Sequence, residues 1–195
     1  MNPIEPITQN VPLLIVGGVA LLALIWVVAT YNTLVRLRQY CRESWSGIDA
    51  ELKRRYDLIP NLIETVKGYV SHERTVLEEV VRARSAAVAS TGSPQSQARD
   101  ENMLVGALRQ LFAVAENYPQ LKASEQFLAL QHELANTEDR IQAVRRFYNA
   151  NVRDLNTRVE VFPSNLIAGL FRFRQEEFFE IEDSGIRLPP EVKLA

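Results

Sequence analysis

The feature that most constrains this chain is a long apolar stretch near its start. Residues 13–29 read LLIVGGVALLALIWVVA, and no charged residue occurs between Glu5 and Arg36. At about 1.5 Å per residue, a helix over residues 11–31 crosses a hydrocarbon core of about 30 Å. A soluble core helix seldom stays apolar on all faces for this length. A signal peptide requires basic residues before its apolar segment, and no Lys or Arg precedes this stretch. The sequence therefore predicts a retained transmembrane helix over residues 11–31.

Basic residues lie on only one side of this stretch. Arg36, Arg38 and Arg42 follow it, whereas Glu5 is the one charged side chain before it. Further basic residues come at Lys53, Arg54 and Arg55. The positive-inside rule then places residues 1–10 outside as a short non-cytoplasmic tail and the rest in the cytoplasm. A basic face next to an anionic leaflet is also attracted to it, so the lipid bilayer is a predicted partner.

The overall composition argues against several classes of protein. The formal net charge of −2 is opposite to the basic excess of a nucleic-acid binder. The single cysteine, Cys41, cannot form an internal disulfide, and no zinc-binding cysteine spacing is present. With only 8 glycines and 9 prolines, the chain lacks the turn composition of an all-β fold.

Apolar residues recur every seven positions in two long segments. In the first, residues 32–89, they are Trp45, Leu52, Ile59 and Val66, then Val80 and Ala87 after an interruption at Glu73. In the second, about residues 100–156, they are Phe127, Leu134, Ile141, Tyr148 and Leu155, with Phe162 one step beyond. A period of seven is typical of long helices packed at a shallow left-handed angle, as in coiled coils.

The two segments predict an all-α fold. Residues 90–97, STGSPQSQ, have the composition of an exposed turn. We expect a transmembrane helix continuing into an elongated antiparallel up-and-down bundle over residues 32–162, with the turn near 90–99. Pro60 and Pro119 lie within the segments and either kink or break them. Two breaks would give a four-helix bundle, and two bends a thinner hairpin.

Residues 163–195 read as a short helix followed by an irregular, extended tail. The helix begins at Pro163-Ser164 and includes Leu166 and Leu170. The phenylalanines at 171, 173, 178 and 179 are predicted to pack back on the bundle. The alternative is an exposed docking segment.

No group of residues suggests catalysis or a bound metal. His72-Glu73 and His132-Glu133 begin like a zinc-protease motif, but Val76 and Asn136 stand where the second histidine is needed. No phosphate-binding or nucleophile motif occurs. We therefore predict no cofactor, no metal and no enzymatic activity.

Asp57, Asn61 and Glu64 form a polar group around Pro60. Asn61 and Glu64 share a helix face, and Asp57 lies one turn earlier. We favour a helix that begins at Pro60, with Asp57 satisfying free amide groups. The alternative is a polar contact site that uses carbonyl groups freed by the proline.

Gln131, Glu138 and Arg145 repeat at seven beside the second apolar stripe. Polar groups there need a hydrogen-bond partner or contact with water. Such groups often fix the register of the helices and the choice of the helix they pack against. Glu73, which interrupts the first stripe, is a predicted partner for Arg145.

Blocks across nearly the whole chain resemble the bacterial LemA family, in order. The most specific block is LKRRYDLIPNLIETVKGYVSHE at residues 52–73. Others are YNTLV at 31–35, WSGID at 45–49, ENYPQLKA at 116–123, LQHELANTED at 130–139, RFYN at 146–149 and Phe162-Pro163. The resemblance implies a membrane segment followed by a cytoplasmic helical bundle, with no established enzymatic activity.

These features together predict a single-pass protein of the bacterial inner membrane. We expect a scaffold or adaptor whose cytoplasmic bundle meets unidentified membrane or cytoplasmic proteins, or further copies of itself as a homo-oligomer. The alternatives are an accessory subunit of a membrane enzyme such as a protease, and a membrane-organising protein.

Overall fold

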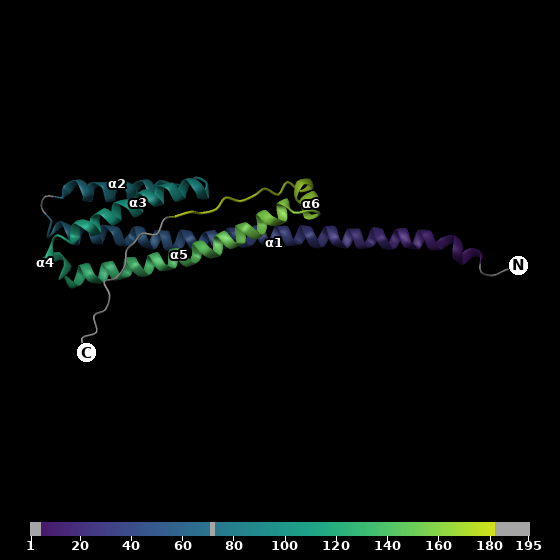
Figure 1. Cartoon of the computed structure of the whole chain (residues 1–195), viewed down its shortest axis with the longest axis horizontal. Coiled ribbons are helices and arrows are strands. Elements are labelled where there is room, and N and C mark those ends of the chain that lie inside the picture. The colour runs from purple at the N-terminus through teal and green to yellow at the C-terminus, as the bar shows by residue number, and fades with distance from the viewer. Residues whose placement is uncertain (1–4, 71–72, 182–195) are drawn as a thin grey trace, which may run out of the picture. The chain divides into compact units, whose positions relative to one another are not determined.

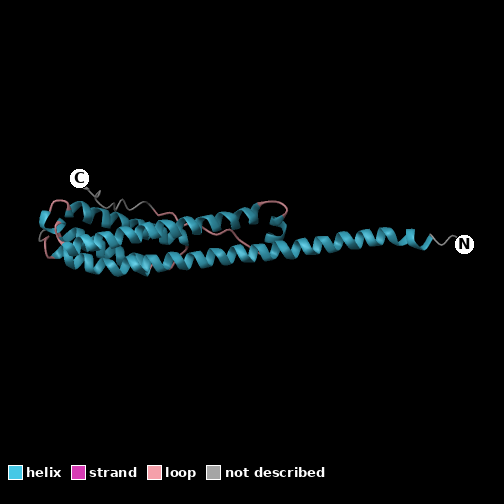
Figure 2. Cartoon of the chain, turned by 90° about the horizontal axis from the view of Figure 1, so that it is seen from below, coloured by secondary structure: helices cyan, strands magenta, loops and turns pink. Residues whose placement is uncertain are grey.

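The computed structural model describes residues 5–70 and 73–181, and side chains from residue 13 onward. The described elements are all helices: α1 (Glu5–Lys67), α2 (Arg74–Ala89), α3 (Pro94–Ala115), α4 (Pro119–Lys122), α5 (Glu125–Glu160) and α6 (Ser164–Leu170) (Figures 1 and 2). No strand occurs among these residues, so the all-α prediction is confirmed. His72 and the predicted extended tail after residue 181 lie outside the described part of the chain.

The chain divides into two compact units. Of the described residues, 5–40 and 152–176 form the first, here called the N-terminal unit, and 41–70, 73–151 and 177–181 form the bundle unit. The helices α1 and α5 each contribute to both units.

In the bundle unit, helices α2, α3 and α5 run alongside residues 41–67 of α1 (Figure 1). The helices α1 and α5 are antiparallel, because the rings of Trp45 and Tyr148 meet edge to face at 5.2 Å while Arg55 pairs with Glu138, which is later in α1 but earlier in α5. The turn between α2 and α3 spans residues 90–93, inside the range that the sequence indicates. The apolar positions of both predicted stripes fill this core, among them Leu52, Ile59, Val66, Val80, Leu134 and Ile141.

The break in the first apolar segment lies after Lys67 and not at Pro60. Helix α1 continues through Pro60 to Lys67, and the chain turns before α2 begins at Arg74. The favoured interpretation of a helix start at Pro60 is therefore wrong. Pro119, in contrast, does begin a helix, since α3 ends at Ala115 and α4 starts at Pro119.

Helix α1 can pass through Pro60 because another helix replaces the missing donor. Proline has no N–H, so the carbonyl oxygen of Tyr56, four residues earlier, loses its helical hydrogen bond. Arg84 of α2 donates from Nε to that oxygen at 2.8 Å. The carbonyl freed by the proline is thus used within the protein, by Arg84, a residue that the sequence did not single out, whereas a contact site at Asp57, Asn61 and Glu64 stays a prediction.

The N-terminal unit contains the apolar stretch, the end of α5, and α6. The most apolar window of α1 has none of its residues buried. Beyond it, Tyr31 contacts the rings of Phe171 at 4.7 Å and Phe173 at 5.9 Å. Asn156 of α5 holds the main chain of Glu176 through two hydrogen bonds of 2.9 Å.

Phe162 does not continue the α5 core stripe. Its exposed fraction is 73%, whereas Leu155, one heptad earlier, is fully buried. The reason is that α5 ends at Glu160, so the heptad geometry no longer applies at residue 162.

The last described residues, 177–181, pack in the bundle unit. Phe179 is fully buried and contacts the ring of Trp45 at 5.2 Å. Asn149 accepts from the main-chain N–H of Phe179 and donates to its carbonyl oxygen. The prediction that the phenylalanines pack inward is right for Phe179 and for Phe173, while Phe171 and Phe178 stay partly exposed.

The contact between Arg84 and Tyr56 gives a stability prediction. Arg84→Met leaves the Tyr56 carbonyl without a donor and should lower the free energy of unfolding by about 1–2 kcal/mol. In a Pro60→Ala background the helix supplies its own N–H, so the same substitution should cost less. Thermal unfolding of the purified protein, followed by circular dichroism, measures both costs.

The matched control is Arg82→Met, which changes an exposed arginine of the same helix. Equal costs for Arg84→Met with and without Pro60 would show that the arginine does not compensate for the proline.

Candidate functional site

The polar residues singled out in the sequence occupy three kinds of position. Asp57, Asn61 and Glu64 are exposed on α1. Glu138 is buried in the core of the bundle unit. Gln131 is half-buried and lines a pocket of about 150 Å³ that also borders Phe112 and Phe127.

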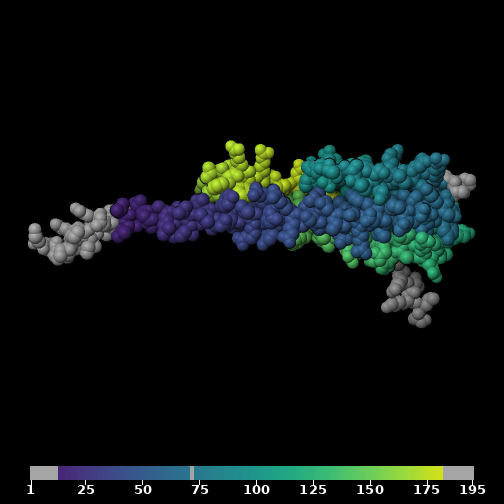
Figure 3. Space-filling model, turned by 180° about the vertical axis from the view of Figure 1, so that it is seen from behind, coloured from purple at the N-terminus to yellow at the C-terminus, as the bar shows by residue number. Residues whose placement is uncertain are grey.

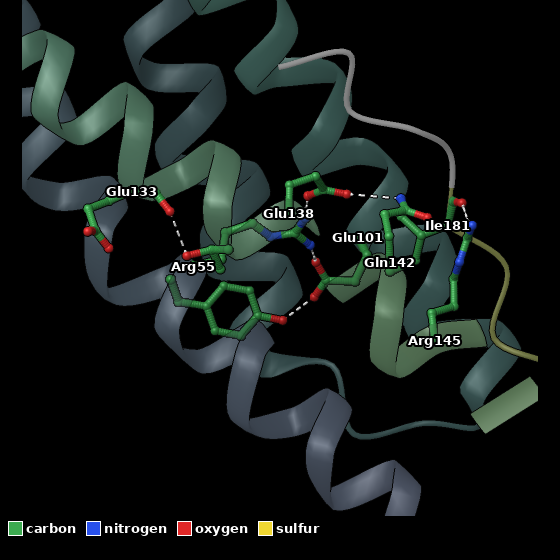
Figure 4. A network of polar contacts seen from close by, with 9 residues as sticks. Arg55, Glu101, Glu133, Glu138, Gln142, Arg145 and Ile181 are labelled. Atoms are coloured by element: carbon green, nitrogen blue, oxygen red, sulfur yellow. Dashed lines mark hydrogen bonds and ion pairs between the residues drawn. The ribbon is translucent and has the colours of Figure 1, made fainter. Parts of the chain in front are cut away.

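The predicted pairing of Arg145 with Glu73 is wrong. Nη1 of Arg145 donates to the main-chain oxygen of Ile181 instead (Figure 4). Glu73 occupies the N-cap position of α2 without a capping hydrogen bond from its side chain. Arg145 therefore holds the end of the described chain against α5.

The membrane-flanking arginines differ in their surroundings. Arg36 and Arg42 are exposed, whereas Arg38 is half-buried with its guanidinium 4.9 Å from the ring centroid of Phe173. Such a cation–π contact attracts the guanidinium to the face of the ring.

A cluster of charged side chains lies in the middle of the bundle unit (Figure 4). The guanidinium of Arg55 on α1 pairs with Glu101 of α3 and, at 2.9 Å, with Glu138 of α5. The exposed fraction of the Arg55 side chain is 1%, and both carboxylates are buried with it. We call Arg55, Tyr56, Glu101, Glu138 and Gln142 the buried charge cluster.

The remaining members satisfy the carboxylate oxygens. The hydroxyl of Tyr56 donates to Oε1 of Glu101, and Gln142 donates to Oε1 of Glu138 at 3.1 Å. Burial, followed by the neighbouring Glu101 carboxylate, raises the pKa of Tyr56, so the phenol keeps its proton and remains a donor. The cluster thus joins three helices through one cation and two anions.

This arrangement suits positioning better than catalysis. Buried charges cost several kcal/mol each to desolvate, and the pairing recovers this only in one geometry. The cluster therefore fixes the register of α1, α3 and α5. Among the described residues no group of three His, Cys, Asp or Glu side chains is placed to hold a metal ion.

A groove lies on the surface of the same unit, between the end of α1 and α2. It holds about 590 Å³. The buried Ile63, Val70 and Leu77 form an apolar floor, and the rim carries the half-exposed Val81 with the exposed Lys67, Arg74, Glu78 and Arg82. Arg74 pairs with Glu78 at 2.6 Å, which leaves Lys67 and Arg82 as the excess positive charge of the rim.

The model of the LemA family matches residues 44–194, which is most of the 195-residue chain. The chain belongs to the LemA family. The protein is also similar to the magnetosome proteins MamQ 1 and MamQ 2 of Paramagnetospirillum magneticum, each 24% identical over 180 residues. These alignments cover 80% of this chain and 66% of the MamQ proteins, so the chain spans less than two thirds of their length.

A shorter relative is protein LemA of Metamycoplasma hominis. It is 27% identical over 167 residues, which cover 80% of this chain and 75% of that protein. None of these relatives has a name that denotes a reaction.

Sequence reasoning about this LemA protein missed Arg55 and Glu101. Arg55 counted as a basic residue that flanks the membrane, but it belongs to the core. A signal was present: Arg55 lies three residues after Leu52 and four before Ile59, both buried positions of the stripe. An arginine at a core position demands a buried carboxylate on a facing helix.

The cluster predicts that two neighbouring arginines of this LemA protein differ sharply in importance. Arg55→Met leaves two carboxylates buried and unpaired, and should cost about 3–5 kcal/mol of stability. Arg54→Met breaks an exposed pair with Glu133 and should cost less than about 1 kcal/mol. Urea unfolding of the two variants measures the difference.

Adding Glu101→Gln and Glu138→Gln to Arg55→Met removes the unpaired charges and should recover part of the loss. A cost for Arg55→Met as small as that of Arg54→Met would contradict a role for the cluster in holding the helices.

Proposed function

We propose that this LemA-family protein is a membrane-anchored, non-enzymatic scaffold or adaptor that presents a helical bundle to other proteins. The proposal rests on one observation, which is that the two parts of α1 have different surroundings. Its residues 13–29 are apolar, and none of the most apolar window is buried, while Ile48, Leu52 and Ile59 of the same helix fill the bundle core. An exposed apolar surface of this size in water is strongly unfavourable, so lipid is its natural environment.

The orientation follows from the charges beyond the apolar stretch. Arg36 and Arg42 are exposed and Arg38 is half-buried, whereas Glu5 is the one charged side chain before the stretch. By the positive-inside rule, the bundle unit faces the cytoplasm, at the inner membrane of a bacterium.

The groove between α1 and α2 is the surface that best fits a partner. Its apolar floor and the excess positive charge of Lys67 and Arg82 suit an amphipathic helix that carries acidic residues beside its apolar face. The buried charge cluster supports this role, because it fixes α1, which forms one wall of the groove.

A second candidate function is membrane organisation. It is favoured by the relatives named as magnetosome proteins and by the exposed Arg36 and Arg42. Vesicle binding that weakens with added salt, and that Arg36→Gln with Arg42→Gln abolishes, would support this candidate over an adaptor.

The orientation is testable with engineered thiols. Cys41 is buried and should be shielded from reagents, so an introduced cysteine reports its own surroundings. Arg42→Cys, at an exposed position, should resist a membrane-impermeant maleimide in intact cells and react after permeabilisation. Asn2→Cys should react in intact cells. The reverse pattern would show that the bundle faces outward.

The groove is testable by crosslinking in cells. A photocrosslinking residue in place of Val81, which lines the groove, should capture a discrete protein. The matched control is the same residue in place of Val88, which lies seven positions along α2, is about equally exposed and does not line the groove.

The double change Lys67→Glu with Arg82→Glu should weaken the Val81 crosslink by charge repulsion. Mass spectrometry then identifies the captured protein. A single membrane enzyme would indicate an accessory subunit, and equal capture from Val81 and Val88 would rule out the groove as the docking site.

A further inference from the structure

A group of apolar side chains on the N-terminal unit faces away from the protein. The exposed fractions are 73% for Phe162, 60% for Leu166 and 72% for Leu170. Val161 and Phe171 are also about half exposed, at 51% and 48%. We call these five residues the α6 patch.

Helix α6 has apolar residues on two faces. Ser164, Ile167 and Ala168 are buried and fix the helix within its unit. Leu166 and Leu170 are four residues apart within α6, which places them together on one side, and the exposed Phe162 lies in the turn just before the helix. The described residues leave this second face uncovered, and a contiguous apolar face of this kind marks an interaction surface.

The α6 patch lies beside the end of the apolar stretch of α1. Phe171 contacts Tyr31 at a ring distance of 4.7 Å, and Tyr31 is two residues past the stretch. Leu34, one turn further, is fully buried. Figure 3 shows this yellow-green part of the chain lying on α1. Each helical residue adds about 1.5 Å along the helix axis, and Tyr31 is only two residues past the stretch. The patch therefore lies near the level at which the apolar stretch ends.

Positive charge surrounds this level of the N-terminal unit. Residues 31–40 and 152–176 contain six arginines and three acidic residues, a net charge of +3. Arg158, Arg172 and Arg174 are exposed close to the patch in sequence. An apolar face with cationic neighbours is the usual composition of a segment that lies in the interface of an anionic membrane.

We propose that the α6 patch inserts into the cytoplasmic interface of the same bilayer that α1 spans. Phe162, Leu166 and Leu170 enter the region between headgroups and acyl chains, and Arg172 and Arg174 meet lipid phosphates. The inference rests on the proposed anchoring by α1. Lipid is the occupant, and not a second copy of the chain, because the patch lies at the level where the membrane-spanning stretch ends and the exposed Arg158, Arg172 and Arg174 are its neighbours in sequence.

Depth-dependent fluorescence quenching tests this with the full-length protein in vesicles of phosphatidylcholine and phosphatidylglycerol. Leu166→Cys or Leu170→Cys carries an environment-sensitive nitrobenzoxadiazole label, and the buried Cys41 stays unlabelled. Lipids with a nitroxide close to the headgroup should remove most of the emission, and aqueous iodide should have little effect.

Two controls separate this proposal from the anchoring itself. Asp154→Cys, at an exposed position of the same unit, should be quenched by iodide and not by nitroxide lipids. Leu22→Cys, inside the apolar stretch, should be quenched by lipids with a deep nitroxide. If lipids with a deep nitroxide do not quench the label at residue 22, the proposed membrane anchoring by α1 is wrong.

With Leu22 quenched as expected, two results would overturn the α6 proposal alone. Strong iodide quenching at residues 166 and 170 would show that the patch faces water. Protection from both iodide and nitroxide lipids would show that protein, such as a second copy, covers it.

Discussion

The bundle unit depends on the buried guanidinium of Arg55. It joins α1 to α3 through Glu101 and to α5 through Glu138, so three helices meet at one charge. Apolar stripes tolerate small shifts along a helix axis, whereas a buried ion pair loses much of its energy when its partners separate. The charges therefore select one register from the several that the stripes alone would allow.

The same unit shows how a helix breaker is accommodated. Pro60 removes a hydrogen bond from α1, and Arg84 of α2 supplies a donor to the free oxygen of Tyr56. The hydrogen bond that α1 loses at Pro60 is thus replaced by a hydrogen bond between α1 and α2. Because α1 continues to Lys67, its last turns, together with α2, form the apolar groove with the charged rim. The residues Ile63 and Lys67, both beyond the proline, belong to the wall that α1 gives to the groove.

The candidate site was partly predictable. Glu138 stands out in the sequence as a polar residue beside the α5 stripe, and it is a member of the buried charge cluster. Its partner could not be deduced, because the choice among many arginines depends on which helices face one another. Arg55 stands in a run of three basic residues, Lys53 to Arg55, and such a run predicts a solvated helix face after the membrane segment. Only the direction of its side chain assigns it to the core.

The sequence by itself determined the helical class, the apolar stretch and the positions of the core stripe, because these follow from local composition and period. It also identified the LemA family from blocks such as residues 52–73. The tertiary structure decided where the helices break, which charges pair and which apolar faces stay uncovered. Phe162 and Phe179 are both aromatic residues after the stripe, yet the first is exposed and the second buried. Such differences arise from packing between distant segments, which no local pattern records.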